Sequence, residues 1–120
     1  MQVKMLQAKL HGVRVTHADP NYEGSCGIDP ELIAAAGLRP YQYIEIYNVA
    51  NGERFSTYII RGTLGPGEIS LNGAAARKAM LGDGLIICAY SLYEEKELER
   101  YRPVVVFVGE GNRIKPGTAR

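Results

Sequence analysis

A serine set between glycines is the part of this chain best suited to unusual backbone chemistry. Ser25 follows Gly24 in the run Tyr22-Glu23-Gly24-Ser25-Cys26-Gly27. Glycine accepts positive φ angles and lets backbone groups approach a neighbouring hydroxyl closely. The Ser25 hydroxyl could therefore attack the Gly24 carbonyl, and elimination and hydrolysis of the resulting ester would leave residue 25 as a pyruvoyl group. Most Gly-Ser dipeptides are ordinary turns, so this hypothesis depends on the rest of the chain.

Two strand-like segments carry the cations that could hold an acidic substrate. Lys9 and His11 share one strand face, and Arg54 and Tyr58 share another, which would place a guanidinium fork near a phenol. Polar residues on a solvated face are the commoner reading of both pairs. Thr57 has the opposite parity to Tyr58, so both reach one site only if the strand is bulged or ends there.

A third segment could present backbone amides to an anion or a carbonyl. Asn72-Gly73-Ala74-Ala75 stands where a helix is expected to begin. An ordinary N-cap explains the same residues at least as well.

Metal and thiol chemistry have weaker support in the sequence. His11, His17 and Asp19 show no recognised ligand spacing, so we expect no metal site. Cys26 could act as a nucleophile, but nothing near it in sequence lowers its pKa. Cys88 lies in an apolar run and is expected to be a buried small hydrophobe.

The elements that must position these residues are mostly short strands. The alternation of apolar residues, the turn residues and the helix caps predict the following elements. Strands are expected over 3–17 with a bulge at Gly12, and over 43–49, 54–60, 68–71, 85–90 and 104–108; helices are expected over 30–36 and 74–80. Asn51-Gly52 predicts a hairpin turn, and the tail at 109–120 is expected to be flexible. This pattern predicts a mainly β barrel or sandwich with short helices.

Length and charge limit the remaining possibilities. The chain has 120 residues with 14 basic and 13 acidic side chains, a formal charge of +1. We therefore expect one domain over 1–120 with no charge-driven binding to nucleic acid or a membrane surface. No secretory signal or bilayer-length apolar run is visible, so a cytoplasmic location is expected.

Four ordered motifs together resemble one enzyme family over roughly residues 1 to 108. The motifs are Lys9-Leu10-His11-Gly12-Val13-Arg14-Val15-Thr16-His17-Ala18-Asp19, Tyr22-Glu23-Gly24-Ser25-Cys26-Gly27-Ile28-Asp29, Asn51-Gly52-Glu53-Arg54-Phe55-Ser56-Thr57-Tyr58 and Asn72-Gly73-Ala74-Ala75-Ala76-Arg77. They closely resemble the bacterial aspartate decarboxylases, pyruvoyl-dependent carboxy-lyases that make β-alanine for pantothenate and coenzyme A. Gly27 and the tail beyond Gly109 depart from the family pattern.

The resemblance implies a fold, an assembly and a set of site residues. It implies a double-psi β-barrel, a homotetramer with active sites at subunit boundaries, and a proenzyme that cuts itself between Gly24 and Ser25. The residues it implies for processing and proton return are Thr57 and Tyr58, and those it implies for the substrate site are Lys9, His11, Arg54, Thr57, Asn72, Gly73, Ala74 and Ala75. In the mechanism that it implies, the amine of L-aspartate forms a Schiff base with the pyruvoyl ketone, so no pyridoxal phosphate is needed.

Two other functions remain open from the sequence. A non-catalytic double-psi binding module would need neither the Gly24-Ser25 cut nor the pairing of Arg54 with Tyr58. A cysteine hydrolase would use Cys26 with His11 or His17 in an intact chain.

Overall fold

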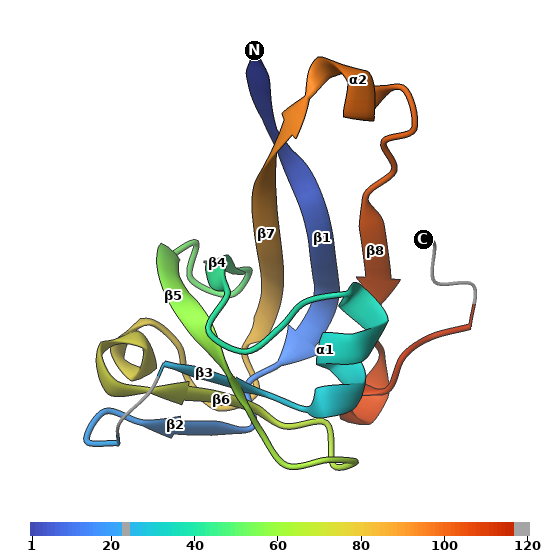
Figure 1. Ribbon diagram of the computed structural model, residues 1–120. Helices are drawn as coiled ribbons and strands as arrows, with labels where there is room; N and C mark the ends of the chain where they lie inside the picture. The colour runs from blue at the N-terminus through green and yellow to red at the C-terminus, as the bar shows by residue number, and fades with distance from the viewer. Residues whose placement is uncertain (23–24, 117–120) are drawn as a thin grey trace.

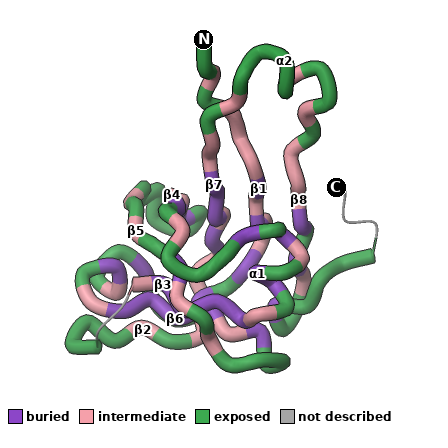
Figure 2. Tube along the Cα trace, viewed as in Figure 1, coloured by how far each residue is buried: buried purple, intermediate pink, exposed green. Residues whose placement is uncertain are grey.

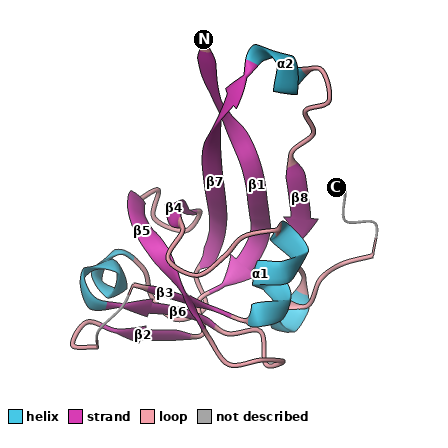
Figure 3. Ribbon diagram, viewed as in Figure 1, coloured by secondary structure: helices cyan, strands magenta, loops and turns pink. Residues whose placement is uncertain are grey.

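The chain folds mainly into strands (Figures 1 and 3). The computed structural model describes residues 1–22 and 25–116. The strands are β1 (Gln2–Arg14), β2 (His17–Asp19), β3 (Cys26–Ile28), β4 (Tyr43–Asn48), β5 (Arg54–Arg61), β6 (Ile69–Asn72), β7 (Gly84–Glu94) and β8 (Val104–Phe107). The helices are α1 (Pro30–Ala36), α2 (Glu95–Leu98) and the 3-10 helices η1 (Gly73–Lys78) and η2 (Glu110–Asn112).

All the described strands join one curled, mixed sheet. Their order across the sheet is β2-β6-β3-β5-β4-β7-β1-β8. Three of the pairs are parallel (β1 with β8, β2 with β6, β3 with β5), and the other four are antiparallel. In Figure 1, β7, β1 and β8 stand side by side while β2, β6 and β3 run across their lower ends. The expected mainly β class with short helices is confirmed, and the curled sheet is consistent with a double-psi β-barrel.

The core lies inside the curl of this sheet, where alternate residues of β4 and of the middle of β1 are buried and where β3 and β6 are buried throughout. Leu10, Ile44, Ile59 and Ile87 are completely buried there. Figure 2 shows burial concentrated in the lower half of the molecule, whereas the upper ends of β1 and β7 and helix α2 are partly or fully exposed. The outward-facing residues of β1 and β4 are therefore free to carry polar side chains.

Strand β1 is bent at two points. Its register against β7 shifts between Leu6 and Ala8, and again between His11 and Val13. Gly12 lies at the second shift with φ 92°, where a Cβ atom would sit 2.8 Å from the Val108 carbonyl oxygen. The bulge expected at Gly12 is confirmed. The strand was expected to reach residue 17, but it ends at Arg14 and the next residues form the separate strand β2.

Helix α1 begins and ends where the sequence predicts. The Asp29 carboxylate accepts the Glu31 backbone N–H at 2.9 Å, and Gly37 ends the helix with φ 68°. The other Asp29 oxygen accepts the backbone N–H groups of Gly65 and Gly67 at 2.9 and 2.8 Å. One buried carboxylate thus caps the helix and holds the loop before β6 against it.

Two further expectations about elements are wrong. The helix expected over 74–80 is the 3-10 helix η1, from residue 73 to 78. Residues 26–28, where no strand was expected, form β3 between β5 and β6.

The tail over 109–120 was expected to be flexible. Residues 109–116 return along the barrel, where Val108 pairs with Ile114. The buried Asn112 side chain accepts the Arg14 N–H at 2.8 Å and donates to the carbonyls of Arg14 and Gly67 at 2.9 and 2.7 Å. Residues 117–120 lie outside the described part of the chain. In residues 1–22 and 25–116, no helix is long and apolar enough to cross a membrane.

Candidate active site

Ser25 directly precedes β3 and lies level with residues of both neighbouring strands, β5 and β6. Cys26 pairs with Ile59 of the parallel strand β5 and with Leu71 of the antiparallel strand β6. Extending that register by one residue aligns Ser25 with Tyr58 on one side and Asn72 on the other. The Asn72 backbone N–H donates to the Ser25 carbonyl oxygen at 2.8 Å. The structure therefore groups Ser25, Tyr58 and Asn72; Gly24, and with it the bond expected to be cut, lies outside the described residues.

Tyr58 and Thr57 face opposite sides of β5. Tyr58 is 40% exposed and its ring stacks with Tyr41, with ring centroids 6.3 Å apart. Thr57 pairs with the fully buried Ile44 and is itself partly buried. No register shift interrupts the β4–β5 pairing, so the bulge that would turn both side chains to one face is absent from this pair.

The cations expected to bind substrate lie on the outer face of the sheet. Cross-strand pairing places five residues in one row across β5, β4, β7, β1 and β8: Arg54, Tyr47, Ile86, His11 and Phe107. The next row carries Ser56, Glu45, Cys88, Lys9 and Val105. We call Lys9, His11 and Arg54, with the residues between them in these two rows, the cationic face.

The charges of Lys9 and Arg54 both act on Cys88, which lies between them in the cationic face. Burial raises the pKa of the Cys88 thiol, whereas a hydrogen bond with Tyr90 and the charges of Lys9 and Arg54 oppose that rise. The ion pairs within residues 1–22 and 25–116 join the Met1 amino group to Glu94 and Lys78 to Glu53. In that part of the chain, Lys9 and Arg54 thus have no carboxylate partner. An acidic ligand could fill this role.

His11 lies beside them in an environment that disfavours its protonated form. Burial lowers the pKa of His11, and the positive charges of Lys9 and Lys115 lower it further. The ring meets Phe107 edge to face, with centroids 5.7 Å apart. Among the described residues, its buried Nδ1 atom has no hydrogen-bond partner. A neutral His11 can both donate and accept a hydrogen bond at this face.

Within one chain the two groups of site residues are separate. Arg54 is four residues from Tyr58 on β5, which corresponds to roughly 13 Å along an extended strand. Arg54 also lies over Tyr47, with its guanidinium carbon 3.8 Å from the ring centroid. The cationic face and the Ser25 group thus occupy different parts of β5, with Tyr58 at the level of Ser25.

The alanine segment of the site follows directly from Asn72. Gly73 has φ 67° and opens η1, which packs against β2, β5 and β6. Asn72 occupies the N-cap position, but its side chain makes no capping hydrogen bond. Ala74 is exposed and Ala75 is buried. The expected segment 73–75 therefore begins beside Ser25.

Comparison with known proteins agrees with the motifs that this geometry brings together. A family model described as aspartate decarboxylase matches residues 1–115. The chain belongs to the aspartate decarboxylase family. It is 63% identical over 115 residues to the aspartate 1-decarboxylase of Ralstonia nicotianae and 62% identical to that of Cupriavidus necator, covering 96% of this chain and of each relative. It is 58% identical to the aspartate 1-decarboxylase of Bordetella pertussis, over 96% of this chain and 94% of the relative.

Membership of the aspartate decarboxylase family makes the chain an enzyme of the carboxy-lyase class. The non-catalytic binding module considered from the sequence is therefore not supported. The cysteine hydrolase is also disfavoured, because complete burial and then the charge of Glu68 raise the pKa of Cys26 to about 12. A thiol that stays protonated is not a nucleophile.

The residues that had been weighed as metal ligands lie on different strands. His11 is on β1, whereas His17 and Asp19 are on β2. No group of three or more His, Cys, Asp or Glu side chains in the described ranges 1–22 and 25–116 could hold a metal ion.

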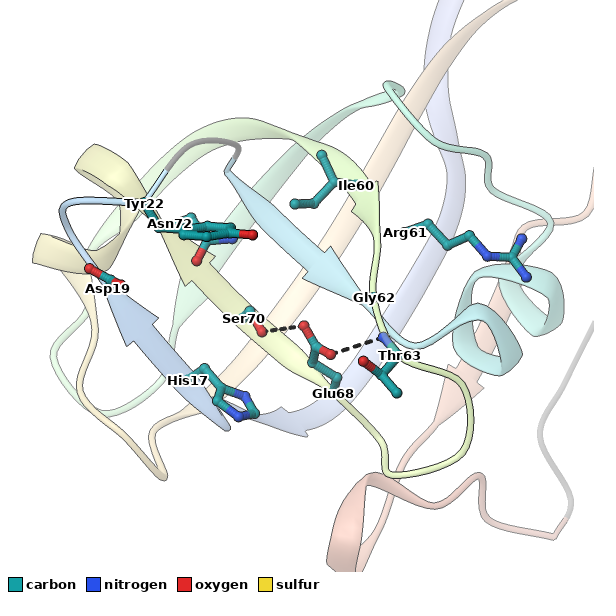
Figure 4. A pocket seen from close by; sticks show the side chains of 10 residues that line it. All are labelled: His17, Asp19, Tyr22, Ile60, Arg61, Gly62, Thr63, Glu68, Ser70 and Asn72. Carbon is teal, nitrogen blue, oxygen red and sulfur yellow. Dashed lines mark hydrogen bonds between the residues drawn. The ribbon is translucent and has the colours of Figure 1, made fainter.

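A shallow pocket of about 440 Å³ lies beside the Ser25 group of this aspartate decarboxylase family member (Figure 4). Its lining residues are His17, Asp19, Tyr22, Ile60, Arg61, Gly62, Thr63, Glu68, Ser70 and Asn72. In Figure 4 the Glu68 carboxylate lies between Ser70 and Thr63, while Arg61 points away from it. Ser70 Oγ and the Thr63 backbone N–H donate to it at 2.5 and 2.9 Å.

The Glu68 carboxylate is built into this pocket. Partial burial raises its pKa, but the hydrogen bonds from Ser70 and Thr63 and the charge of His17 outweigh burial, so the net shift is downward. A Cβ on Gly27 would lie 3.0 Å from Glu68 Oε2, so a glycine at this position leaves room for the carboxylate.

Sequence reasoning did not select Glu68, Tyr47 or Tyr90. Tyr47 could have been found from the sequence, because its parity in the strand expected over 43–49 is opposite to that of the buried isoleucines. The partners of Glu68 and Tyr90 depend on strand register, which no local pattern gives.

Proposed function

We propose that this protein converts L-aspartate into β-alanine and CO₂ by means of a pyruvoyl group formed from Ser25 when the chain cuts itself after Gly24. The family supports aspartate decarboxylation as the reaction. The observation that supports self-cleavage and a pyruvoyl group is the alignment of Ser25 with Tyr58 and Asn72 across three neighbouring strands. The β-alanine would supply pantothenate and coenzyme A synthesis in the cytoplasm.

The surroundings of residue 25 fit such a group. The Asn72 N–H holds the Ser25 carbonyl at 2.8 Å, and that carbonyl becomes the amide oxygen next to the new ketone. When formed, the pyruvoyl group supplies a ketone that captures the substrate amine and accepts the electron pair released with CO₂. Gly73, Ala74 and Ala75, which follow Asn72, would border the bound substrate.

The cationic face would bind the side-chain carboxylate of the substrate. A cation clamped on the departing carboxylate would stabilise the ground state and oppose its loss. Arg54 and Lys9 should therefore hold mainly the side-chain carboxylate of aspartate, with His11 completing the contact as a neutral partner.

Tyr58 would return the proton to carbon after CO₂ has left. A phenol is acidic enough to donate to a strongly basic carbon centre, and Tyr58 stands at the level of Ser25. Thr57 belongs to the proposal as well, in processing and in the contact with substrate, although its side chain lies on the opposite face of β5 from Tyr58.

The separation of the two groups favours a site shared between copies of the chain in a homotetramer. The cationic face of one copy would then meet the Ser25 group of another. Large apolar side chains border this face: Tyr43 is 57% exposed and Phe107 is 40% exposed. Apolar side chains around an open polar site are typical of a surface that a partner covers.

Intact-mass spectrometry of the purified protein tests the processing step directly. We expect one fragment that ends at Gly24 and one that begins at residue 25 with a carbonyl in place of its amine. Ser25→Ala should stay uncut and make no β-alanine, because alanine has no hydroxyl to attack the Gly24 carbonyl. A full-length chain that decarboxylates aspartate after long incubation would exclude the pyruvoyl mechanism.

A further inference from the structure

The Arg54 guanidinium lies over an aromatic ring that is itself held in place. Its central carbon is 3.8 Å from the Tyr47 ring centroid, and Tyr47 is its cross-strand partner. A guanidinium that stacks on an aromatic ring uses the face of its plane and leaves its N–H edges free. No carboxylate within residues 1–22 and 25–116 pairs with Arg54. Its N–H groups are therefore not already held by an acidic side chain in that part of the chain.

The Tyr47 ring is fixed by hydrogen bonds to its hydroxyl group. Tyr47 donates to Glu45 Oε1 at 3.1 Å, and its oxygen lies 2.8 Å from the Tyr90 hydroxyl. The single Tyr47 hydroxyl hydrogen is given to Glu45, so Tyr90 must be the donor to Tyr47. The hydrogen bond with Tyr47, together with burial, raises the pKa of Tyr90, which agrees with a donor role.

We propose that Tyr47, fixed by Glu45 and Tyr90, is a positioning residue that holds the Arg54 fork in the orientation needed for the substrate side-chain carboxylate. This inference rests on the proposed function, in which Arg54 holds that carboxylate. Tyr47, Glu45 and Tyr90 themselves need touch neither the substrate nor the reacting atoms. A guanidinium that is oriented before binding loses less conformational entropy when the ligand arrives.

The first test removes one hydroxyl at a time and separates substrate binding from turnover. Tyr47→Phe and Tyr90→Phe should each raise the KM for aspartate by about threefold to tenfold, the loss expected for one or two hydrogen bonds, while kcat stays within about twofold. Calorimetric titration with succinate, a dicarboxylate without an amine, should show a parallel loss of affinity. Tyr93→Phe makes the same chemical change seven residues beyond Ile86 on β7 and should leave both values unchanged.

The second test asks whether Tyr47 acts through Arg54. In an Arg54→Lys background, which has no planar group to stack, Tyr47→Phe should change KM by less than about twofold. Tyr47→Trp keeps an aromatic face and a hydrogen donor and should retain more succinate affinity than Tyr47→Leu. Each variant is used only after its urea midpoint and its extent of self-cleavage match those of the parent.

The outcomes separate failure of this inference from failure of the proposed function. If Arg54→Lys raises KM while Tyr47→Phe and Tyr90→Phe do not, the positioning role is wrong and the function stands. Effects of Tyr47→Phe that are equal in both backgrounds would also overturn it. If the parent protein neither cuts itself nor makes β-alanine, the proposed function fails, and the succinate titrations alone then decide the role of Tyr47.

Discussion

Tyr58 is the residue at which the two halves of the site come closest along one chain. It shares a strand face with Arg54, and its register places it beside Ser25. Its ring has support from Tyr41, while its partly exposed position leaves the hydroxyl accessible to a ligand. These features suit a proton donor that must meet a substrate held from both sides.

Replacing only the Tyr58 hydroxyl should separate covalent capture from turnover. Tyr58→Phe keeps the ring and its contact with Tyr41, so the chain should still cut itself and bind the substrate amine. It should lose at least about 100-fold in β-alanine production, the usual scale for removing a general acid. Borohydride trapping of the substrate adduct, compared with product formation, measures the two steps. A variant that decarboxylates at the parent rate would assign proton delivery to another group.

The environment of His11 predicts a pH dependence of stability. Burial and the charges of Lys9 and Lys115 lower the pKa of His11 below 6.5 in the folded protein. As pH falls below 6.5, the unfolded chain takes up this proton before the folded chain does, so the free energy of unfolding decreases. This contribution is present above pH 6.5 and is lost as pH falls through the lowered pKa.

A substitution that cannot titrate tests this assignment. His11→Gln should flatten the fall in urea midpoint between neutral pH and about pH 5.5. Carboxylates are still ionised over most of that range, so they contribute little to it. An equal fall in the parent and in His11→Gln would place the titrating group elsewhere.

At the scale of elements, one side chain in the segment after β8 joins that segment to two distant parts of the barrel. Asn112 is buried, adopts φ 55°, and makes hydrogen bonds to the backbone of Arg14 and Gly67. It therefore connects the end of β1, the loop before β6 and the C-terminal segment.

Loss of this side chain should therefore destabilise the fold. Asn112→Ala removes three hydrogen bonds, and we expect a loss of about 2–4 kcal/mol in the free energy of unfolding. Chemical denaturation measures the change. Arg113→Ala, at the exposed neighbouring residue, is the matched control and should alter stability by less than about 0.5 kcal/mol. Equal midpoints for the two variants would show that Asn112 is not the anchor.

The elements that the sequence predicts well are those specified by local rules. Asp29, Pro30 and Gly37 define α1 because caps act within one turn, and Asn51-Gly52 defines the β4–β5 hairpin because turn geometry is local. Strand β3 was not predicted because its three residues show no strand pattern of their own and are defined as a strand only by their pairing with β5 and β6. The structural role of Asn112 was not predicted because its hydrogen-bond partners are 98 and 45 residues away in the sequence.

The same distinction applies to the site. The motifs around Ser25, Arg54 and Tyr58 identified the expected site residues, and strand parity correctly placed Thr57 opposite Tyr58. Strand register, which sequence does not supply, was needed to align Ser25 with Asn72 and to stack Arg54 on Tyr47. The roles of these residues stay predictions until the variants are measured.

At the scale of the whole molecule, a shared site predicts complementation between two inactive chains. Ser25→Ala cannot form the ketone, and Arg54→Ala cannot grip the carboxylate, so each should be inactive alone. When the two are expressed together, about a quarter of the sites should combine an intact Ser25 group with an intact cationic face. Product formation by the co-purified mixture measures this recovery.

The same mixture can exclude the shared site. Mixing the two variants after separate folding and assembly is the control, and it should recover less activity than co-expression does. If both chains are present in one assembly and no activity returns, the site is formed within single chains.

The position of β1 has a consequence for any chain cut after Gly24. This strand belongs to the shorter fragment, yet it runs between β7 and β8 of the longer one, and β2 of the same fragment pairs with β6. The mature protein would then be two interwoven polypeptides, each supplying strands that the other needs. Once unfolded, such a pair must find each other again in solution, so refolding would be bimolecular and would depend on protein concentration. The uncut precursor, whose halves are still tethered, would have the easier route to the native state.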